Sequence, residues 1–147
     1  MAVARHLRWF VAVVCDRDRG TEKLSHSLLV SNYDDRLRNH GFLMLAPGRW
    51  ALSPAYDLNP VPEMDRTQVP ATPISERQEP PAIAAALAAA PRFGLHATAA
   101  RAILREVFTA VSGWRHAGKA LRIKASTLDA YATAFDNPLM AEAGKLA

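Results

Sequence analysis

"SLLVSNYDDRLRNHGFLMLAPGRWALSPAYDL", residues 27–58, passes from an apolar helix end through a polar loop into two short apolar runs. Leucines recur at helical spacing in "TEKLSHSLLV", residues 21–30, which predicts a helix with Thr21 as its N-cap. The apolar runs "GFLML" and "RWALS" are separated by "APG", whose Pro47 and Gly48 are turn residues. A small β-hairpin is therefore expected directly after the polar loop.

The segment that follows the hairpin predicts a long loop and then a helix. Residues 59–81 carry six prolines, which remove backbone donors and disfavour helix, so we expect a surface loop there. The segment "PPAIAAALAAAP", residues 80–91, predicts an alanine-rich helix with Pro81 in its first turn and Pro91 at its end. Such a helix can pack closely against a neighbour.

The C-terminal third predicts further helix. Between residues 98 and 116, apolar side chains recur at steps of three and four, the most regular amphipathic pattern in the chain. Ser126 and Asp129 have the spacing of a capping box and predict the start of a last helix. Residues after Asn137 are expected to fray. The predicted fold class is mainly α, or α+β, with one small hairpin.

Composition and charge exclude several functions. Eighteen Lys and Arg against 14 Asp and Glu leave a formal net charge of +4, and the basic residues form no dense run, so direct nucleic-acid binding is not expected. The single cysteine, Cys15, excludes an internal disulfide, and no Cys or His pair has zinc-ligand spacing. The apolar run 9–15 follows basic residues, as in a minimal signal peptide, but it is far too short to span a bilayer. We expect a buried helix or strand there, in a cytoplasmic protein with no membrane contact.

A partial phosphate-binding motif occurs near the C-terminus. "GWRHAGKA", residues 113–120, has two glycines at P-loop spacing with Lys119 after the second. The motif requires a preceding strand and a Ser or Thr at position 120, where this chain has alanine. Gly118 is more simply predicted to be a helix C-cap beside Lys119.

The polar loop has the spacing of a phosphoryl-transfer site. Asp34 and Asn39 are separated as in the catalytic-loop pattern D-x-x-x-x-N of protein kinases. Such a site also needs a second carboxylate downstream to hold the metal ion, and Asp57 lies just past the predicted hairpin. Arg36 would add a fixed positive charge beside the transferred phosphate.

A second interpretation of the same loop involves no chemistry. Asp34, Asp35, Arg36 and Arg38 could form a solvated loop that caps the preceding helix and makes surface ion pairs of little energetic value. Spacing alone favours this interpretation.

The full sequence of the polar loop and the segment after the hairpin favours the first interpretation, a phosphoryl-transfer site. "NYDDRLRNHGFL" followed by "WALSPAYDLNPVPE" resembles the catalytic and metal-binding segment of HipA-family serine/threonine kinases, the toxins of bacterial toxin–antitoxin pairs. The resemblance runs from about Ser27 to about Phe135. It implies that Asp34 is the catalytic aspartate, that Asn39 and Asp57 are magnesium ligands, and that Mg²⁺ and ATP are the cofactors.

The resemblance also indicates residues that would contact the nucleotide. The family usually carries histidine two residues after the catalytic aspartate and lysine two residues further on. This chain has Arg36 and Arg38 at those positions. Arg36, Arg38 and Tyr56 are therefore the predicted nucleotide contacts.

The resemblance implies a kinase-like C-terminal lobe over residues 27–136, with residues 1–26 unassigned and 137–147 as a flexible tail. Kinases of this family have two lobes, and their nucleotide-clamping lysine and glycine-containing loop precede the catalytic loop. The 33 residues before Asp34 contain one glycine, Gly20, and no comparable lysine motif. We therefore expect little phosphoryl transfer from this chain alone.

The expected partners are a HipB-like antitoxin or a separate N-terminal kinase lobe, and the protein substrate stays open. The alternative function is a non-catalytic helical module that docks on such a partner.

Overall fold

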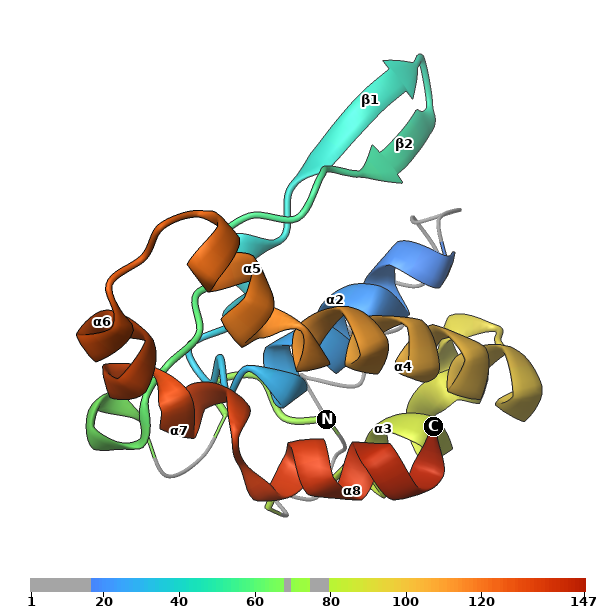
Figure 1. The fold of residues 1–147 in the computed structure, drawn as a ribbon. Helices are drawn as coiled ribbons and strands as arrows, with labels where there is room; N and C mark the ends of the chain where they lie inside the picture. The colour runs from blue at the N-terminus through green and yellow to red at the C-terminus, as the bar shows by residue number, and fades with distance from the viewer. Residues whose placement is uncertain (1–16, 68–69, 75–79) are drawn as a thin grey trace.

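The computed structural model describes residues 17–67, 70–74 and 80–147 (Figure 1). The described residues are mostly helical, with a two-stranded antiparallel sheet, which confirms the predicted fold class. The α-helices are α2 (Arg17–Leu29), α3 (Ile83–Ala89), α4 (Ala97–Ser112), α5 (Trp114–Ala120), α6 (Ala125–Ala130), α7 (Ala132–Phe135) and α8 (Pro138–Leu146). The short 3₁₀ helices are η1 (Leu37–Asn39), η2 (Glu63–Asp65) and η3 (Ala90–Phe93). The prediction for residues 9–15 lies outside the described residues.

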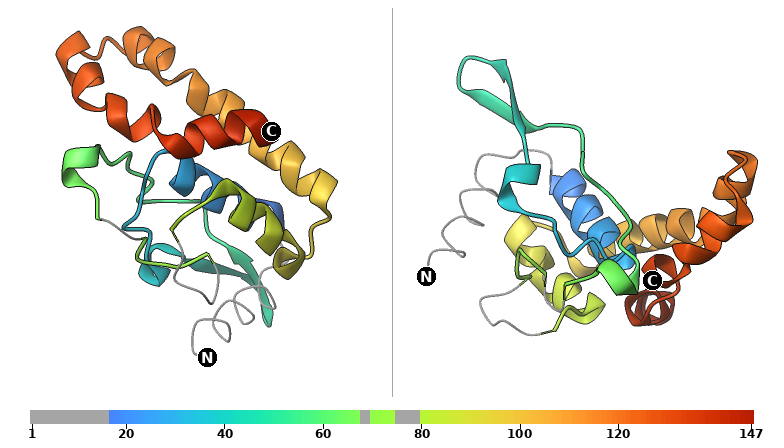
Figure 2. Two further views of the ribbon diagram at one scale, coloured as in Figure 1. Left: turned by 90° about the horizontal axis from the view of Figure 1, so that it is seen from below. Right: turned by 90° about the vertical axis from the view of Figure 1, so that its left-hand side faces the viewer.

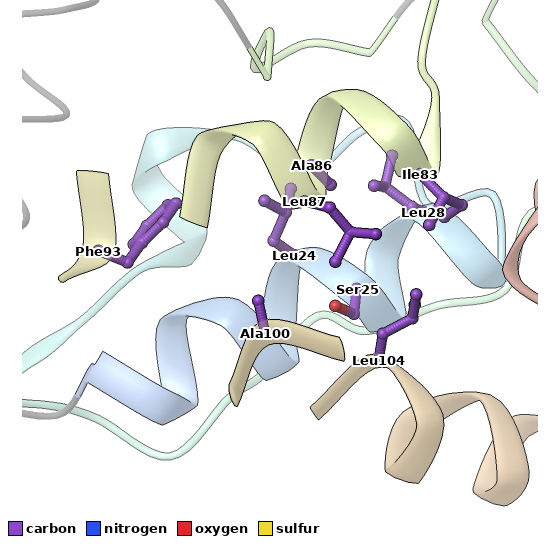
Figure 3. Close-up of a pocket in the computed structure, with 9 residues that line it drawn as sticks. All are labelled: Leu24, Ser25, Leu28, Ile83, Ala86, Leu87, Phe93, Ala100 and Leu104. Carbon is purple, nitrogen blue, oxygen red and sulfur yellow. The ribbon is translucent and has the colours of Figure 1, made fainter. Parts of the chain in front are cut away.

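The hydrophobic core lies where α2, α3, α4 and α8 meet (Figures 1 and 2). Its buried members are Leu28, Leu29, Val30, Ile83, Leu104, Val111, Leu139 and Ala143. Figure 3 shows side chains of α2, α3, η3 and α4 converging on a cavity of about 10 Å³, barely the size of one water molecule. The end of α2 is therefore held rigidly by close packing, and the polar loop begins from that end.

The hairpin pairs β1 (Phe42–Ala46) with β2 (Arg49–Leu52), as the sequence predicts. Pro47 followed by Gly48 with φ of 74° is the combination that a type II turn requires. The register shifts between Met44 and Ala46, which leaves Leu45 as an extra residue on β1. The hairpin extends away from the helices (Figures 1 and 2). Leu43, Met44, Leu45 and Trp50 on it are exposed, whereas Leu52 at the end of β2 is buried.

The predicted helix ends in the first half of the chain need two corrections. Thr21 is not an N-cap, because α2 already begins at Arg17. Pro81 is not in the first turn of α3, because the extended residue Ala82 is the N-cap and the helix begins after it. Pro91 does end the α-helix and lies in η3, as predicted. The proline-rich segment is mainly loop where it is described, with the single turn η2.

The predicted helix over residues 98–116 is formed but interrupted. α4 ends at Ser112, and Gly113 separates it from α5. Gly118 is not a C-cap, because it lies inside α5 and is buried against α6, where an added Cβ would stand 2.5 Å from Leu128 Cδ2. This close approach explains a glycine in a helix interior.

The predicted capping box at Ser126 is wrong. α6 begins at Ala125, and the N-cap is Lys124, which makes no side-chain capping bond. The φ and ψ of Lys124, −59° and 141°, end the preceding loop there and place Ser126 inside the first turn.

The prediction of a frayed tail after Asn137 is also wrong, because the residues form α8. Asn137 caps this helix by accepting a hydrogen bond from the Met140 backbone N–H at 3.0 Å. The Glu142 carboxylate then accepts from the backbone N–H groups of Ile83 and Ala84 at 3.0 and 2.9 Å. Since α3 has no side-chain cap of its own, α8 satisfies the donors at its N-terminus.

Candidate functional site

The polar loop and the segment after the hairpin are both anchored to the end of α2. Beyond Leu29 the chain turns at Ser31, which has φ of 56°, and the Asn32 N–H bonds back to the Ser27 carbonyl at 2.8 Å. The returning segment is fixed beside it, because the Val61 N–H donates to the Val30 carbonyl at 3.2 Å. Two stretches separated by a hairpin thus lie side by side on one helix end.

Asn39 and Asp57 meet at this junction. Asn39 is buried, and its Nδ2 donates to Asp57 Oδ2 at 2.6 Å and lies 3.4 Å from the Asp34 carbonyl. Asn32 donates to the Asp57 carbonyl at 3.0 Å, and Asn59 Nδ2 donates to Asp57 Oδ1 at 2.8 Å. Three asparagine amides therefore fix Asp57 while its side chain stays exposed.

Asp57 has an unusual backbone conformation. Its φ is 56°, in the left-handed region that aspartate and asparagine tolerate better than most residues. In this conformation the carboxylate faces Asn39. The side-chain type at this position is therefore suited to both the backbone conformation and the contact.

Asp34 lies at the solvent-exposed side of the loop. Its Oδ1 accepts from Arg36 Nε at 2.6 Å, and the two side chains are 55% and 51% exposed. Because solvent screens an ion pair this exposed, the contact orients the Asp34 carboxylate more than it stabilises the fold. Arg36, predicted to face a phosphate, is placed against the predicted catalytic aspartate.

The Tyr56 side chain is hydrogen-bonded to the backbone of Arg38. Tyr56 Oη donates to the Arg38 carbonyl at 2.9 Å, which ties the residue beside Asp57 to the residue beside Asn39. Both side chains are exposed, Tyr56 by 44%. The structure thus gives Tyr56 a bracing contact, and the predicted nucleotide contacts of Arg38 and Tyr56 stay predictions.

A second polar layer lies beneath the loop, and its residues are not among the site residues predicted from the sequence. Lys23 of α2 is buried, with its ammonium 3.3 Å from Asp35 Oδ1. Ser27 donates to Asp35 Oδ2 at 3.2 Å, and His40 Nε2 lies 3.8 Å from the same oxygen. The one signal that could have indicated this layer is helical spacing, since Lys23 and Ser27 share the face of α2 that leads to the buried Val30.

The donor set at the junction fits a magnesium ion. Mg²⁺ binds through one or two carboxylates and keeps water or phosphate oxygens in its other positions. Asp57 supplies a carboxylate, and Asn39, whose Nδ2 contacts that carboxylate here, also carries an amide oxygen of the kind that binds Mg²⁺. The part of the chain that the structure describes contains no cluster of three or more His, Cys, Asp or Glu residues suited to a metal. An ion held by Asp57 and Asn39 would keep water or phosphate oxygens in its remaining positions.

An open groove of about 530 Å³ lies behind this polar layer, between α2, the segment after β2, and α4. Lys23 and His26 contribute to one wall, and Glu106 and Val107 of α4 to another. Burial lowers the pKa of His26 below its usual 6.5, because desolvation disfavours the protonated ring.

The chain matches a protein-family model described as the HipA-like C-terminal domain, over residues 2–114. The match covers well over half of the chain, so the chain belongs to this family. The matched segment includes both arms of the junction, and it starts before Ser27, where the sequence resemblance begins, and ends before Phe135. No curated protein and no solved structure matches the chain. Within residues 17–67, 70–74 and 80–147, no helix combines the length and apolar character needed to cross a bilayer.

Proposed function

We propose that this chain supplies the catalytic loop and the magnesium ligands of a HipA-like serine/threonine protein kinase. The observation that carries the proposal is the 2.6 Å contact between Asn39 and Asp57, two residues 18 positions apart that the hairpin brings together beside Asp34. This is the constellation that phosphoryl transfer requires, with one carboxylate for the acceptor and an amide and a second carboxylate for the metal. Family membership supports the same assignment.

Each residue has a distinct role in this proposal. Asp34 accepts the proton of the serine or threonine hydroxyl and orients that hydroxyl toward the phosphate, and Arg36 holds the Asp34 carboxylate in place. Asn39 and Asp57 hold magnesium, which neutralises charge on the phosphates when ATP is bound. Arg38 and Tyr56, exposed beside the two ligands, are the proposed nucleotide contacts.

We propose further that nucleotide clamping requires residues outside the described part of the chain or a second protein. Among the described residues the strands are β1 and β2, "FLMLA" and "RWAL", and neither carries a lysine that could hold the phosphates from above. A kinase lobe provided by another segment or chain, or an antitoxin that regulates it, is the proposed partner. On this basis the described residues, without such a complement, bind magnesium and nucleotide weakly and transfer phosphate poorly.

Calorimetric titration with Mg²⁺ and ATP tests the proposal. The wild-type chain and an Asp65→Ala control, which loses an exposed acid in η2, should both bind. Asp57→Ala should not bind, because its carboxylate is a ligand. An absence of binding by a folded wild-type sample, or unchanged binding by Asp57→Ala, contradicts the proposed metal site.

Asp34→Ala separates the acceptor base from the metal ligands. This variant should keep metal binding, because the Asp34 backbone carbonyl and not its carboxylate faces Asn39. Once a complementary lobe restores activity, the same variant should lower the transfer rate about 100- to 10,000-fold, as loss of a general base does. An undiminished rate would remove Asp34 from the mechanism.

A second candidate function is a non-catalytic module that docks on an antitoxin or a kinase partner. The observation that favours it is the apolar surface of the hairpin, where Leu43, Met44, Leu45 and Trp50 are 49%, 59%, 63% and 43% exposed. Exposed large apolar side chains grouped on one hairpin are typical of interaction surfaces. If docking is the function, Leu45→Ser and Trp50→Ser should weaken association with the partner, whereas Asp57→Ala should leave it intact. The opposite pattern would reject this candidate.

A further inference from the structure

Lys23 is buried, and a buried lysine requires partners for its charge. Its side chain is 4% exposed, and lysine is rarely buried to that extent unless its charge is paired. The ammonium makes an ion pair with Asp35 at 3.3 Å and donates a hydrogen bond to the Asn39 carbonyl. It also lies 5.6 Å from the centre of the Tyr56 ring, within cation–π range. One charge thus contacts the catalytic loop and the segment after the hairpin.

These contacts fall on the immediate supports of both proposed metal ligands. Asn39 is held through its backbone carbonyl by Lys23, while its side chain faces Asp57. Tyr56, the residue before Asp57, lies against the same ammonium and donates to the Arg38 carbonyl, next to Asn39. Removing the ammonium would therefore release both segments in the region where they have to stay together.

Asp35 keeps the Lys23 charge in place without joining the site. Its carboxylate also accepts from Ser27, and its backbone carbonyl accepts from Thr72 Oγ1 at 2.6 Å. The Asp35 carboxylate is therefore bound into the layer beneath the loop, in contrast to the exposed Asp34 carboxylate beside it. The two neighbouring aspartates therefore have different roles. Asp35 is the partly buried partner of Lys23, and Asp34 is exposed to solvent.

We propose that Lys23 is a positioning residue for the magnesium site, acting through the Asn39 carbonyl and the Tyr56 ring and without contacting the metal or the nucleotide. This inference rests on the proposed function, since it names what holds Asn39 against Asp57. Groups that orient metal ligands typically change metal affinity about 10- to 100-fold when they are removed. The same loss is expected when Lys23 is replaced.

The test uses the full chain and two readouts. The first is Mn²⁺ affinity, measured by paramagnetic resonance of the free ion, with Asp57→Ala as the variant that lacks the site. The second is the side-chain amide resonance of Asn39 in the metal-free protein, which reports its contact with Asp57. The variants are Lys23→Met, which removes the charge at similar length, and Lys23→Met/Asp35→Asn, which also neutralises the Asp35 carboxylate, 15% exposed, that the first change leaves without its lysine partner.

The double variant separates positioning from folding. It should regain much of the thermal stability that Lys23→Met loses, because the partly buried Asp35 carboxylate no longer stays charged without its lysine partner. Its Mn²⁺ affinity should nevertheless stay about 10- to 100-fold below wild type, and its Asn39 amide resonance should stay displaced. Wild-type affinity with a wild-type Asn39 resonance in either folded Lys23 variant would overturn the inference.

The two readouts also separate this inference from the proposed function. If the wild-type chain shows no Mn²⁺ binding that depends on Asp57, the magnesium site is wrong. The Asn39 resonance then tests by itself whether Lys23 positions Asn39 against Asp57. A displaced resonance in the folded double variant supports this positioning, and an unchanged resonance refutes it.

Discussion

Asn137 links the C-terminal helix to the end of α2, and replacing it should destabilise the whole domain. The residue is 9% exposed, and its Oδ1 accepts from the Met140 N–H at 3.0 Å. Its Nδ2 donates to the carbonyls of Leu29 and Ala134, both at 2.8 Å. Leu29 is the last residue of α2, the helix from which the polar loop begins. The Asn137 side chain therefore fixes both the start of α8 and the end of α2.

The contacts give the magnitude for Asn137→Ala. Loss of an N-cap costs about 1 kcal/mol. Each of the two carbonyls that loses its donor in a buried position adds about 1 kcal/mol. The expected loss in free energy of unfolding is thus about 3 kcal/mol, or about 6–12 °C in melting temperature for a chain of this size.

Urea unfolding followed by circular dichroism measures this loss, and Asn137→Ser is the matched control. Serine can still cap α8 but cannot reach both carbonyls, so the control should lose about 2 kcal/mol, the share of the two donated bonds. A loss below about 1 kcal/mol for Asn137→Ala would refute the reasoning, because it lies below what the cap and the donors cost together.

Two further predictions concern residues of α2 and its end. Burial lowers the pKa of His26 below 6.5, so its contribution to stability is complete above pH 6.5 and is lost as the pH falls from 6.5 through the lower folded-state value. Melting temperatures of wild type should therefore fall more steeply between pH 8 and pH 5.5 than those of His26→Gln, and equal slopes would contradict this. Ser31 has φ of 56°, is 0% exposed, and its hydroxyl has no hydrogen-bond partner among the described residues. Ser31→Gly should raise the free energy of unfolding by about 0.5–1 kcal/mol, because left-handed backbone costs a non-glycine residue about 1–2 kcal/mol, offset partly by the more flexible unfolded chain. Ser31→Val should destabilise the protein, and chemical denaturation of both variants checks the pair.

Elements stabilised by local signals could be predicted from the sequence. The hairpin was predicted because Pro47 and Gly48 specify its turn, and α2 and α4 because their apolar residues follow the helical period. α8 has a local start signal, because Asn137 is its N-cap and Pro138 follows directly, but the rest of its support is not local. Glu142 bonds to a residue 59 positions away and Asn137 to one 108 positions away. No periodic pattern can indicate such contacts.

The candidate site could be predicted in part for the same reason. The proximity of Asn39 and Asp57 followed from a spacing that the hairpin enforces, and the structure brings the two side chains into contact. Lys23 was missed because a lysine in a helix normally faces solvent. Its burial depends on Asp35 and Tyr56 closing over it, which only the folded chain shows.

The contribution of α8 to the core sets the size of the folding unit. Leu139 and Ala143 belong to the same buried cluster as Leu28 and Val30, although they lie beyond residue 114, where the family match ends. A chain shortened to the matched residues would lose this part of the core, the Glu142 cap on α3 and the Asn137 link to Leu29. Anyone who expresses the domain for binding studies should therefore keep residues 115–147, which include Asn137 and α8, since the boundary of sequence similarity is not the boundary of cooperative folding.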